Sequence, residues 1–260
     1  NVVANQWKSD TNVSQVNWNA LYQANYKNNA INPNGTARYS VERRHNDLME
    51  GSFNSTYTQQ VNKQLKLIAG IEGKMSKGMH YKTLDDLLGG NQWIDIDQFS
   101  ERDFPSNPDI IQNDLKNRNA VIKENDIFGY NYDINMAYAN AFIQNEWILP
   151  QFDIYYAGKL TYTQFYRYGH MQNGRAPENS YGKSKTWYFV DPSLKAGFTY
   201  KIDGHNRLSF NGLIESRAPL ASQAYLSERI KDTLIPYLQS QDIWSTDINY
   251  NFTYSTIRGR

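Results

Sequence analysis

The chain has 260 residues, no cysteine and a formal net charge of +1. The near-neutral charge argues against a dedicated nucleic-acid-binding protein, and the absence of cysteine excludes disulfides and thiolate metal sites. No run of about 18 apolar residues occurs, which excludes a transmembrane helix. The 20 tyrosines, 11 phenylalanines and 6 tryptophans remain compatible with transmembrane strands, whose lipid-facing residues are hidden in alternating segments.

Residues 1–38 are polar and rich in asparagine, with an Asn-Pro-Asn-Gly turn at 32–35. Apolar residues before this turn have roughly helical spacing, and we expect a loop with one short helix. The chain begins at Asn1, with neither an initiator methionine nor a signal segment. We therefore expect a mature or excised piece of a longer protein.

Apolar and polar residues then alternate with period two, the pattern of strands with unlike faces. The third of the predicted hairpins has an Asp-Gly turn, the strongest short hairpin signal. A further strand is expected at 244–254, which gives about seven strands in total. The predicted hairpins lie at 46–75, 139–162 and 191–219, with tight turns at 62–64, 149–151 and 203–206.

The connections alternate in length along the chain. Tight turns of three or four residues at one end oppose long segments at 78–135, 166–185 and 216–241. Short periplasmic turns and long extracellular loops are typical of outer-membrane barrels. A soluble β-sandwich with one solvated face gives the same alternation along its strands and remains an alternative.

Seven strands are too few to close a barrel around these polar residues, and the unpaired edges would not be tolerated in lipid. The sequence therefore predicts an all-β fold, a segment of a larger antiparallel transmembrane β-barrel. In this interpretation residues 1–38 form an extracellular loop, 39–254 form barrel strands and loops, and 255–260 begin a periplasmic turn.

Residues 39–254 resemble the barrel of TonB-dependent outer-membrane receptors. In that family a proline, a basic residue, a glycine and an aromatic residue precede a periplasmic turn, and the returning strand reaches Arg-Ala-Pro. Segments 95–105 and 173–183 are similar to the branch of large receptors with an N-terminal carboxypeptidase-regulatory-like extension. The residues that carry the family pattern here are Pro192, Lys195, Gly197, Tyr200, Leu208, Phe210, Arg217, Ala218 and Pro219.

The resemblance implies a transporter in the outer membrane of a Gram-negative bacterium, and neither an enzyme nor a cofactor-binding protein. Such receptors import a scarce nutrient with energy from the TonB complex, which acts through an N-terminal region that this chain lacks. The plug domain and the terminal aromatic residue are also absent. Implied partners are outer-membrane lipid, a surface lipoprotein and a small-molecule, glycan or peptide ligand.

Two alternatives remain at this point. One is a soluble all-β module that binds a glycan or a peptide, and the other is a passive porin or adhesin barrel. One observation distinguishes the soluble module from a membrane barrel. In the soluble module the apolar residues of the strands pack against a second sheet, whereas in a barrel they face outward and are uncovered. The residues that test it are Phe53, Leu67, Tyr156, Phe198, Phe210 and Tyr250.

The long loops supply the candidate ligand-binding residues, since loops on a rigid scaffold commonly carry function. Aromatic rings can stack on a ligand, and arginines can bind carboxylates or hydroxyls. The aspartates are possible calcium ligands, although a solvated acidic loop and a self-packed aromatic loop are the simpler interpretations. The candidates are Trp93, Asp95, Asp97, Phe99, Arg102, Arg167 and Arg175.

No catalytic set is predicted. The four histidines are scattered singly, and neither the H-E-x-x-H nor the G-x-S-x-G pattern occurs. We therefore expect no metal centre and no catalytic residue.

Overall fold

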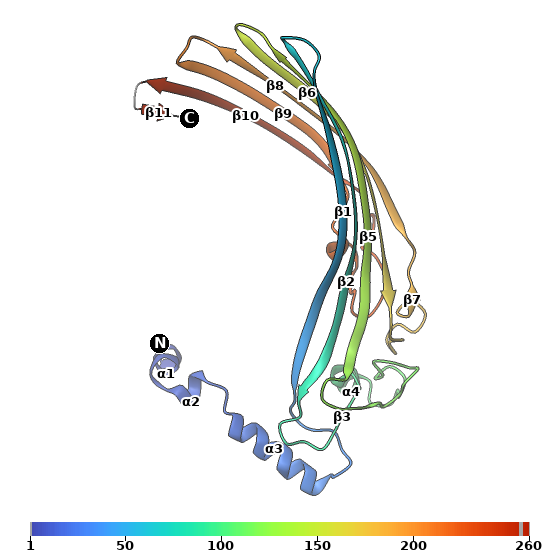
Figure 1. Cartoon of the computed structure of the whole chain (residues 1–260). Helices are drawn as coiled ribbons and strands as arrows, with labels where there is room; N and C mark the ends of the chain where they lie inside the picture. The colour runs from blue at the N-terminus through green and yellow to red at the C-terminus, as the bar shows by residue number, and fades with distance from the viewer. Residues whose placement is uncertain (1, 255–256, 260) are drawn as a thin grey trace.

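The computed structural model describes residues 2–254 and 257–259. Seven long antiparallel strands form one sheet that curls into a half-barrel and does not close (Figure 1). The order along the sheet follows the chain, so each strand pairs with the previous long one. These strands are β1 (Val41–Gln60), β2 (Leu65–Asp86), β5 (Ile127–Ile148), β6 (Phe152–Gly169), β8 (Trp187–Lys201), β9 (Asn206–Arg217) and β10 (Gln241–Tyr254).

Short elements complete the fold. The strand β7 (Gly182–Lys183) pairs with β6, and β11 (Ile257–Gly259) pairs with β10. A separate two-stranded sheet consists of β3 (Trp93–Ile94) and β4 (Val121–Ile122). No helix in the described part of the chain is long and apolar enough to cross a membrane. The helices are α1 (Val2–Ser9), α2 (Thr11–Ser14), α3 (Trp18–Ile31), α4 (Gln98–Asp103) and α5 (Ala221–Ala224).

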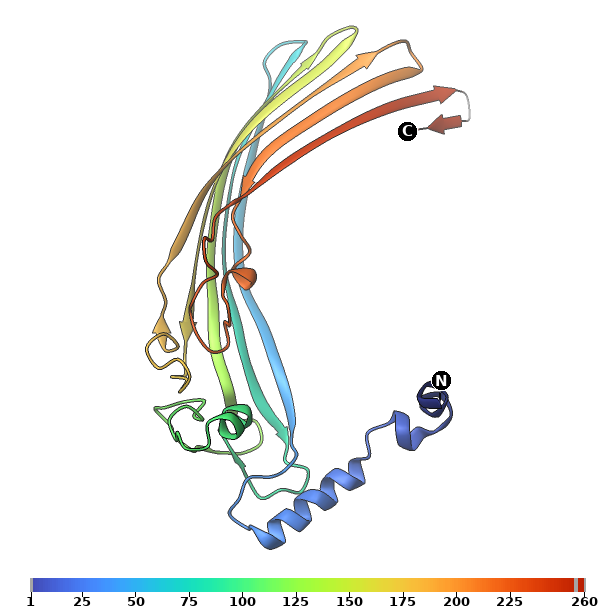
Figure 2. The same cartoon turned by 180° about the vertical axis from the view of Figure 1, so that it is seen from behind.

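The two faces of the curled sheet differ in chemistry. Helix α5 packs on Phe165, and Figures 1 and 2 place α5 on the inner side of the curl, so Phe165 belongs to the concave face. The cross-strand register then assigns each alternate residue to one face. Four ion pairs lie on the concave face. Lys66–Glu146, Lys74–Glu50 and Lys201–Asp153 link neighbouring strands, and Lys159–Glu215 reaches from β6 across β8 to β9.

The convex face carries a band of exposed apolar and aromatic side chains, which we call the apolar belt. The six residues chosen from the sequence to distinguish a barrel from a soluble module, Phe53, Leu67, Tyr156, Phe198, Phe210 and Tyr250, all lie on this face. The register pairs Phe198 with Phe210, and the pairing of the other strands puts the remaining four on the same side of the sheet. In the described part of the chain the only other sheet is the short β3–β4 pair, so no second sheet covers the belt. Exposed belt members include Phe53, Ile71, Ile143, Tyr156, Leu160, Leu194, Phe210, Ile214, Trp244, Ile248 and Tyr250.

The all-β class, the antiparallel pairing and the three predicted tight turns are confirmed. The strands β2 and β5 are each 22 residues long and extend well into the segment 78–135, which we expected to be loop. In the loop-end half of β5 the apolar residues lie on the concave face, where Phe128, Ile134 and Met136 join apolar clusters, so the period-two pattern continues there with its apolar side reversed. The loop-end half of β2 mixes charged and apolar residues on both faces and shows no clear alternation. The opposite connections are long, at 87–126, 170–186 and 218–240.

Two expectations for the chain ends are wrong. Residues 1–38 contain three helices and not a loop with one short helix, because Asn17 caps α3 through Ala20 N and the buried Asn25 fastens α3 to the sheet. Residues 257–259 form a strand that returns along β10, where we expected only the beginning of a turn. Residues 255, 256 and 260 of that prediction lie outside the described residues.

Candidate functional site

A hollow of about 410 Å³ lies on the concave face at the long-loop end of the sheet, and we call it the loop-end hollow. The strands β1 and β2 form its floor, and the loop 87–126 with α4 forms its wall. Both aromatic rings and charged groups reach it. Its lining includes Arg38, Tyr39, Glu42, Arg44, Lys82, Trp93, Asp97, Phe99, Asn113 and Phe128.

The charges on the floor are tightly connected. The Glu42 carboxylate accepts hydrogen bonds from Arg44 Nε at 2.7 Å and from Lys82 Nζ at 2.8 Å. Lys82 Nζ also lies 4.3 Å from the centre of the Phe128 ring, a cation–π distance. Two cations therefore share one carboxylate, which leaves this part of the hollow positive.

Arg38 adds a third cation at the rim of the hollow. Its guanidinium makes no hydrogen bond or ion pair with any described residue; only its backbone N–H is bonded, to Asn25. A free guanidinium has five donors in a planar fork suited to carboxylate or phosphate oxygens. The hollow thus presents, beside aromatic surfaces, a guanidinium without a protein partner in the described part of the chain.

Helix α4 positions the wall. Asp97 caps the helix by accepting from Phe99 N at 3.0 Å and Ser100 N at 3.3 Å. Arg175 Nη1 approaches the same carboxylate at 3.6 Å. The Phe99 ring is 71% exposed although it is large and apolar. Such a ring on the wall of a hollow is available to stack on a ligand.

Trp93 both packs inside the loop and lines the loop-end hollow. Its ring meets the Phe128 ring edge-on at a centroid distance of 6.1 Å, inside a small apolar cluster with Leu84 and Ile122. This packing of the loop on itself was one of the two interpretations considered from the sequence. The same ring also lines the loop-end hollow, so both uses coexist.

Asp95 holds the loop together. It is buried, and its Oδ1 accepts from Asn113 Nδ2 at 2.7 Å and Gly129 N at 2.9 Å. Burial raises the pKa of this carboxyl, and the two hydrogen bonds oppose that shift. No group of three histidine, aspartate or glutamate side chains among the described residues is arranged to hold a metal.

Neither Arg167 nor Arg102 lines the hollow, although the Arg102 guanidinium lies 5.8 Å from the centre of the Phe99 ring. Arg167 is buried on the concave face, where its Nε donates to Glu228 O and its Nη1 to Ser180 O, both at 2.7 Å. These contacts make it a fastener of two loops. Arg102 pairs with Asp103 at 2.8 Å on the exposed side of α4. Of the seven predicted residues, Trp93, Asp97 and Phe99 line the hollow, and Arg175 reaches it through Asp97.

Sequence reasoning missed the floor residues Arg38, Glu42, Arg44 and Lys82. The alternation of Glu42 and Arg44 was a signal that both side chains share a face. Lys82 joins them because the register places it opposite Arg44, across a hairpin of about forty residues. This part of the β1–β2 pairing lies outside residues 46–75, where the alternation of apolar and polar residues predicted the hairpin.

Comparisons with protein-family models, with curated proteins and with solved structures found no match to this chain. Three cations, two carboxylates and several rings suit binding of a ligand with a flat face and an anionic group.

Proposed function

We propose that this chain is a wall segment of the barrel of an outer-membrane TonB-dependent receptor that imports a nutrient. The apolar belt is the observation that carries the proposal. A soluble protein rarely exposes a contiguous apolar patch above a few hundred Å². Here the belt spans all seven long strands, while the opposite face carries ion pairs.

The height of the belt suits a bilayer. On β6 it runs from Phe152 to Tyr162, about 33 Å along the strand at ~3.3 Å per residue. A tilt of about 40° brings this to ~25 Å, the usual height of the apolar band of outer-membrane barrels.

Aromatic residues border the belt at both ends, as the girdles of such barrels do. The middle is aliphatic, with Leu160 and Leu194 among its exposed members. Near the tight turns Phe152 stacks on Phe198 and Tyr200, with centroid distances of 5.6 Å and 5.3 Å. Near the long loops the bordering rings are Tyr162, Tyr166, Tyr188 and Trp244.

The proposal assigns a role to each part of the chain. The long loops are extracellular and capture the ligand, and the loop-end hollow on the lumen side is its contact site. The plug and the region that engages the TonB complex belong to other parts of the receptor. A surface lipoprotein that covers the loops is a further expected partner.

A passive barrel is the second candidate, and one observation favours it. The loop 218–240 folds inward, since Ala221, Ala224 and Tyr225 pack on the concave face against Phe165. An inward loop narrows a lumen without any plug. Uptake that stops when the proton-motive force is collapsed supports the receptor, and uptake that continues supports the passive barrel.

The belt is tested by an adjacent pair of substitutions on β9. Ile214 lies on the convex face and Leu213 on the concave face. We expect Ile214→Arg to remove the protein from the outer-membrane fraction, because arginine near the bilayer midplane costs about 2 to 4 kcal/mol. The control Leu213→Arg is expected to remain membrane-bound after urea extraction. Equal recovery of the two variants contradicts the belt as a lipid-facing surface.

The hollow is tested by ligand binding. With Trp93 fluorescence as the readout, we expect acidic oligosaccharides or peptides to bind more tightly than their neutral counterparts. Arg38→Ala is expected to weaken binding of the acidic compounds about tenfold, the order of one charge-assisted contact. Arg207→Ala, which removes an exposed arginine of β9 at the tight-turn end of the sheet, serves as the control. Equal effects of both substitutions argue against the hollow as the ligand site.

A further inference from the structure

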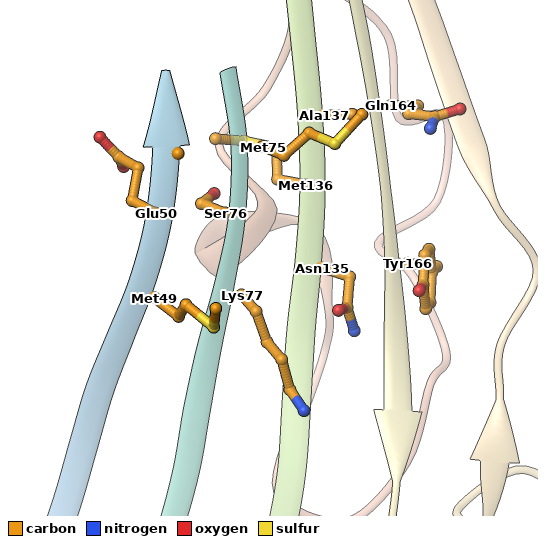
Figure 3. Close-up of a pocket in the computed structure, with 11 residues that line it drawn as sticks. Met49, Glu50, Met75, Ser76, Lys77, Asn135, Met136, Ala137, Gln164 and Tyr166 are labelled. Carbon is orange, nitrogen blue, oxygen red and sulfur yellow. The ribbon is translucent and has the colours of Figure 1, made fainter.

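A groove runs over the convex face where β1, β2, β5 and β6 approach the long loops (Figure 3). Two hollows of about 410 Å³ and 650 Å³ compose it. They are continuous, because Gly51, Met75, Ala137 and Gln164 line both. We call this feature the lipid-side groove.

The floor of the groove is open. A Cβ atom added at Gly51 or Gly73 would meet no heavy atom within 4 Å, so neither glycine is required by a close contact. Gly73 pairs with Ala139 on β5, which extends the small-residue floor across the sheet. Met49 and Met75, 71% and 72% exposed, stand beside this floor. Flexible thioether side chains adapt to apolar ligands of varied shape.

The end of the groove nearest the loops is polar. Figure 3 shows Lys77, Asn135 and Tyr166 at this end, with Met49 beside Lys77, and Met75 and Ala137 at the other end. Lys77 Nζ lies 2.9 Å from Asp133 Oδ2, and Lys183 Nζ lies 4.3 Å from the centre of the Tyr166 ring. The groove therefore joins an apolar channel to a cluster of polar groups.

The charge at this polar end is positive. Asp133 is only 4% exposed and is already bonded to both Lys77 and His170 Nε2, each at 2.9 Å. Lys183 forms no ion pair within the described part of the chain. Asp133 is thus shared by Lys77 and His170, and Lys183 over the Tyr166 ring is a cation without an ionic partner among the described residues.

We propose that the lipid-side groove binds a phosphorylated membrane lipid, with an acyl chain over Gly51 and Gly73 and the phosphate at Lys77 and Lys183. This inference rests on the proposed function, because it needs the convex face to contact the bilayer. The polar end lies at the loop-side border of the belt, the level at which headgroups meet the protein. At the boundary between acyl chains and headgroups, lysines typically lay their methylene chains along apolar surface and place the ammonium group among the headgroups.

The inference is tested with the protein extracted from the outer membrane, delipidated in detergent and titrated with phosphatidylglycerol or with diacylglycerol, which lacks the phosphate. Native mass spectrometry counts the bound lipid. We expect saturable binding of one phosphatidylglycerol and weaker binding of diacylglycerol. Lys77→Ala/Lys183→Ala is expected to weaken phosphatidylglycerol binding about tenfold, since each lysine contributes near a headgroup.

The apolar part of the groove is tested by filling it. Gly73→Leu is expected to weaken phosphatidylglycerol binding about tenfold, and Gly212→Leu is the control. Gly212 is equally open and lies on the same face, but on β9, away from Lys77. Unchanged binding in the double lysine variant, or an equal loss in Gly212→Leu, overturns the inference. Recovery of the protein in the membrane fraction reports on the proposed function separately from these titrations.

Discussion

Asn25 shows how a single buried side chain fastens helix α3 to the sheet. Its Nδ2 donates to the carbonyls of Tyr39, Leu87 and Leu88, and its Oδ1 accepts from the backbone N–H groups of Arg38 and Tyr39. All of these groups belong to the strand entry and to the loop after β2. One amide therefore satisfies five backbone groups, which would otherwise be buried without partners.

We expect Asn25→Leu to release α3 and to lower the local free energy of unfolding by about 2 to 4 kcal/mol, because it leaves buried polar groups unpaired. Hydrogen exchange at the Arg38 and Tyr39 amides measures this change. Asn19→Leu alters an exposed asparagine of the same helix and is expected to leave that exchange unchanged. Similar exchange rates in the two variants contradict the assigned role of Asn25.

Asp95 makes the stability of the loop 87–126 dependent on pH. Burial raises its pKa in the folded state above the ordinary value. The folded state therefore binds the proton more tightly than the unfolded chain, and the free energy of unfolding rises as pH falls through the raised pKa toward the ordinary one. We expect denaturant unfolding, followed by Trp93 fluorescence, to show this rise.

Asp95→Asn separates this effect from other titrating groups. The amide keeps an oxygen acceptor for Asn113 and Gly129 but carries no titratable charge. We expect the stability of the wild type relative to the variant to rise as the pH falls toward the ordinary pKa of an aspartate, about 3.9. A difference that is constant with pH contradicts the prediction.

At the scale of elements, the loop 218–240 is held against the concave face by both apolar and polar contacts. Phe165 packs on Ala224 and Tyr225, and Arg167 binds the carbonyl of Glu228. A backbone hydrogen bond from Ile235 N to Ala224 O closes the loop on itself. Its inward position thus depends on side chains of β6.

We expect Arg167→Met to loosen this loop by about 2 kcal/mol, because the Glu228 carbonyl loses a charged donor. Limited proteolysis at Arg229 and Lys231 is the measurement, and faster cleavage is the expected result. Lys159→Met changes another concave-face cation of β6 and is expected to leave cleavage unchanged, since its ion pair with Glu215 is longer, at 3.7 Å. Equal cleavage in both variants contradicts the role of Arg167.

At the scale of the whole molecule, the half-barrel exposes both a face and an edge. The belt lacks a covering layer in the described part of the chain, and β1 forms one border of the sheet with its 20-residue outer edge unpaired. Unpaired edges and apolar patches both promote association in water. The fold is therefore suited to a bilayer and to additional strands beside β1.

We expect the isolated chain to associate in aqueous buffer and to be dispersed by detergent above its micellar concentration. Detergent covers the belt and removes the driving force for association. Light scattering coupled to size-exclusion chromatography measures the mass in both conditions. A stable monomer in buffer without detergent contradicts both the belt and the proposed function.

The strand centres, the tight turns and the set of apolar residues that share one face follow from the sequence alone, whereas the uncovered, convex position of that face is a result of the fold. Within the belt, one face is apolar and the other polar, so residues such as Phe53 and Phe198 carry a period-two signal. At the loop end of β5 the apolar residues, such as Phe128 and Ile134, lie on the opposite, concave face, and the loop end of β2 has no clear alternation. The attachment of α3 depends on Asn25 meeting a loop about sixty residues away, which no local pattern encodes.

Only the tertiary structure decided the candidate site. Trp93, Asp97 and Phe99 could be chosen by residue type within a long loop, but Lys82 enters the loop-end hollow through its register with Arg44. The separation of Arg167 and Asp95 from the other candidates depends on burial, which residue type does not reveal. Pairing across the sheet and burial are properties of distant segments brought together, and this is why they became visible only in the folded chain.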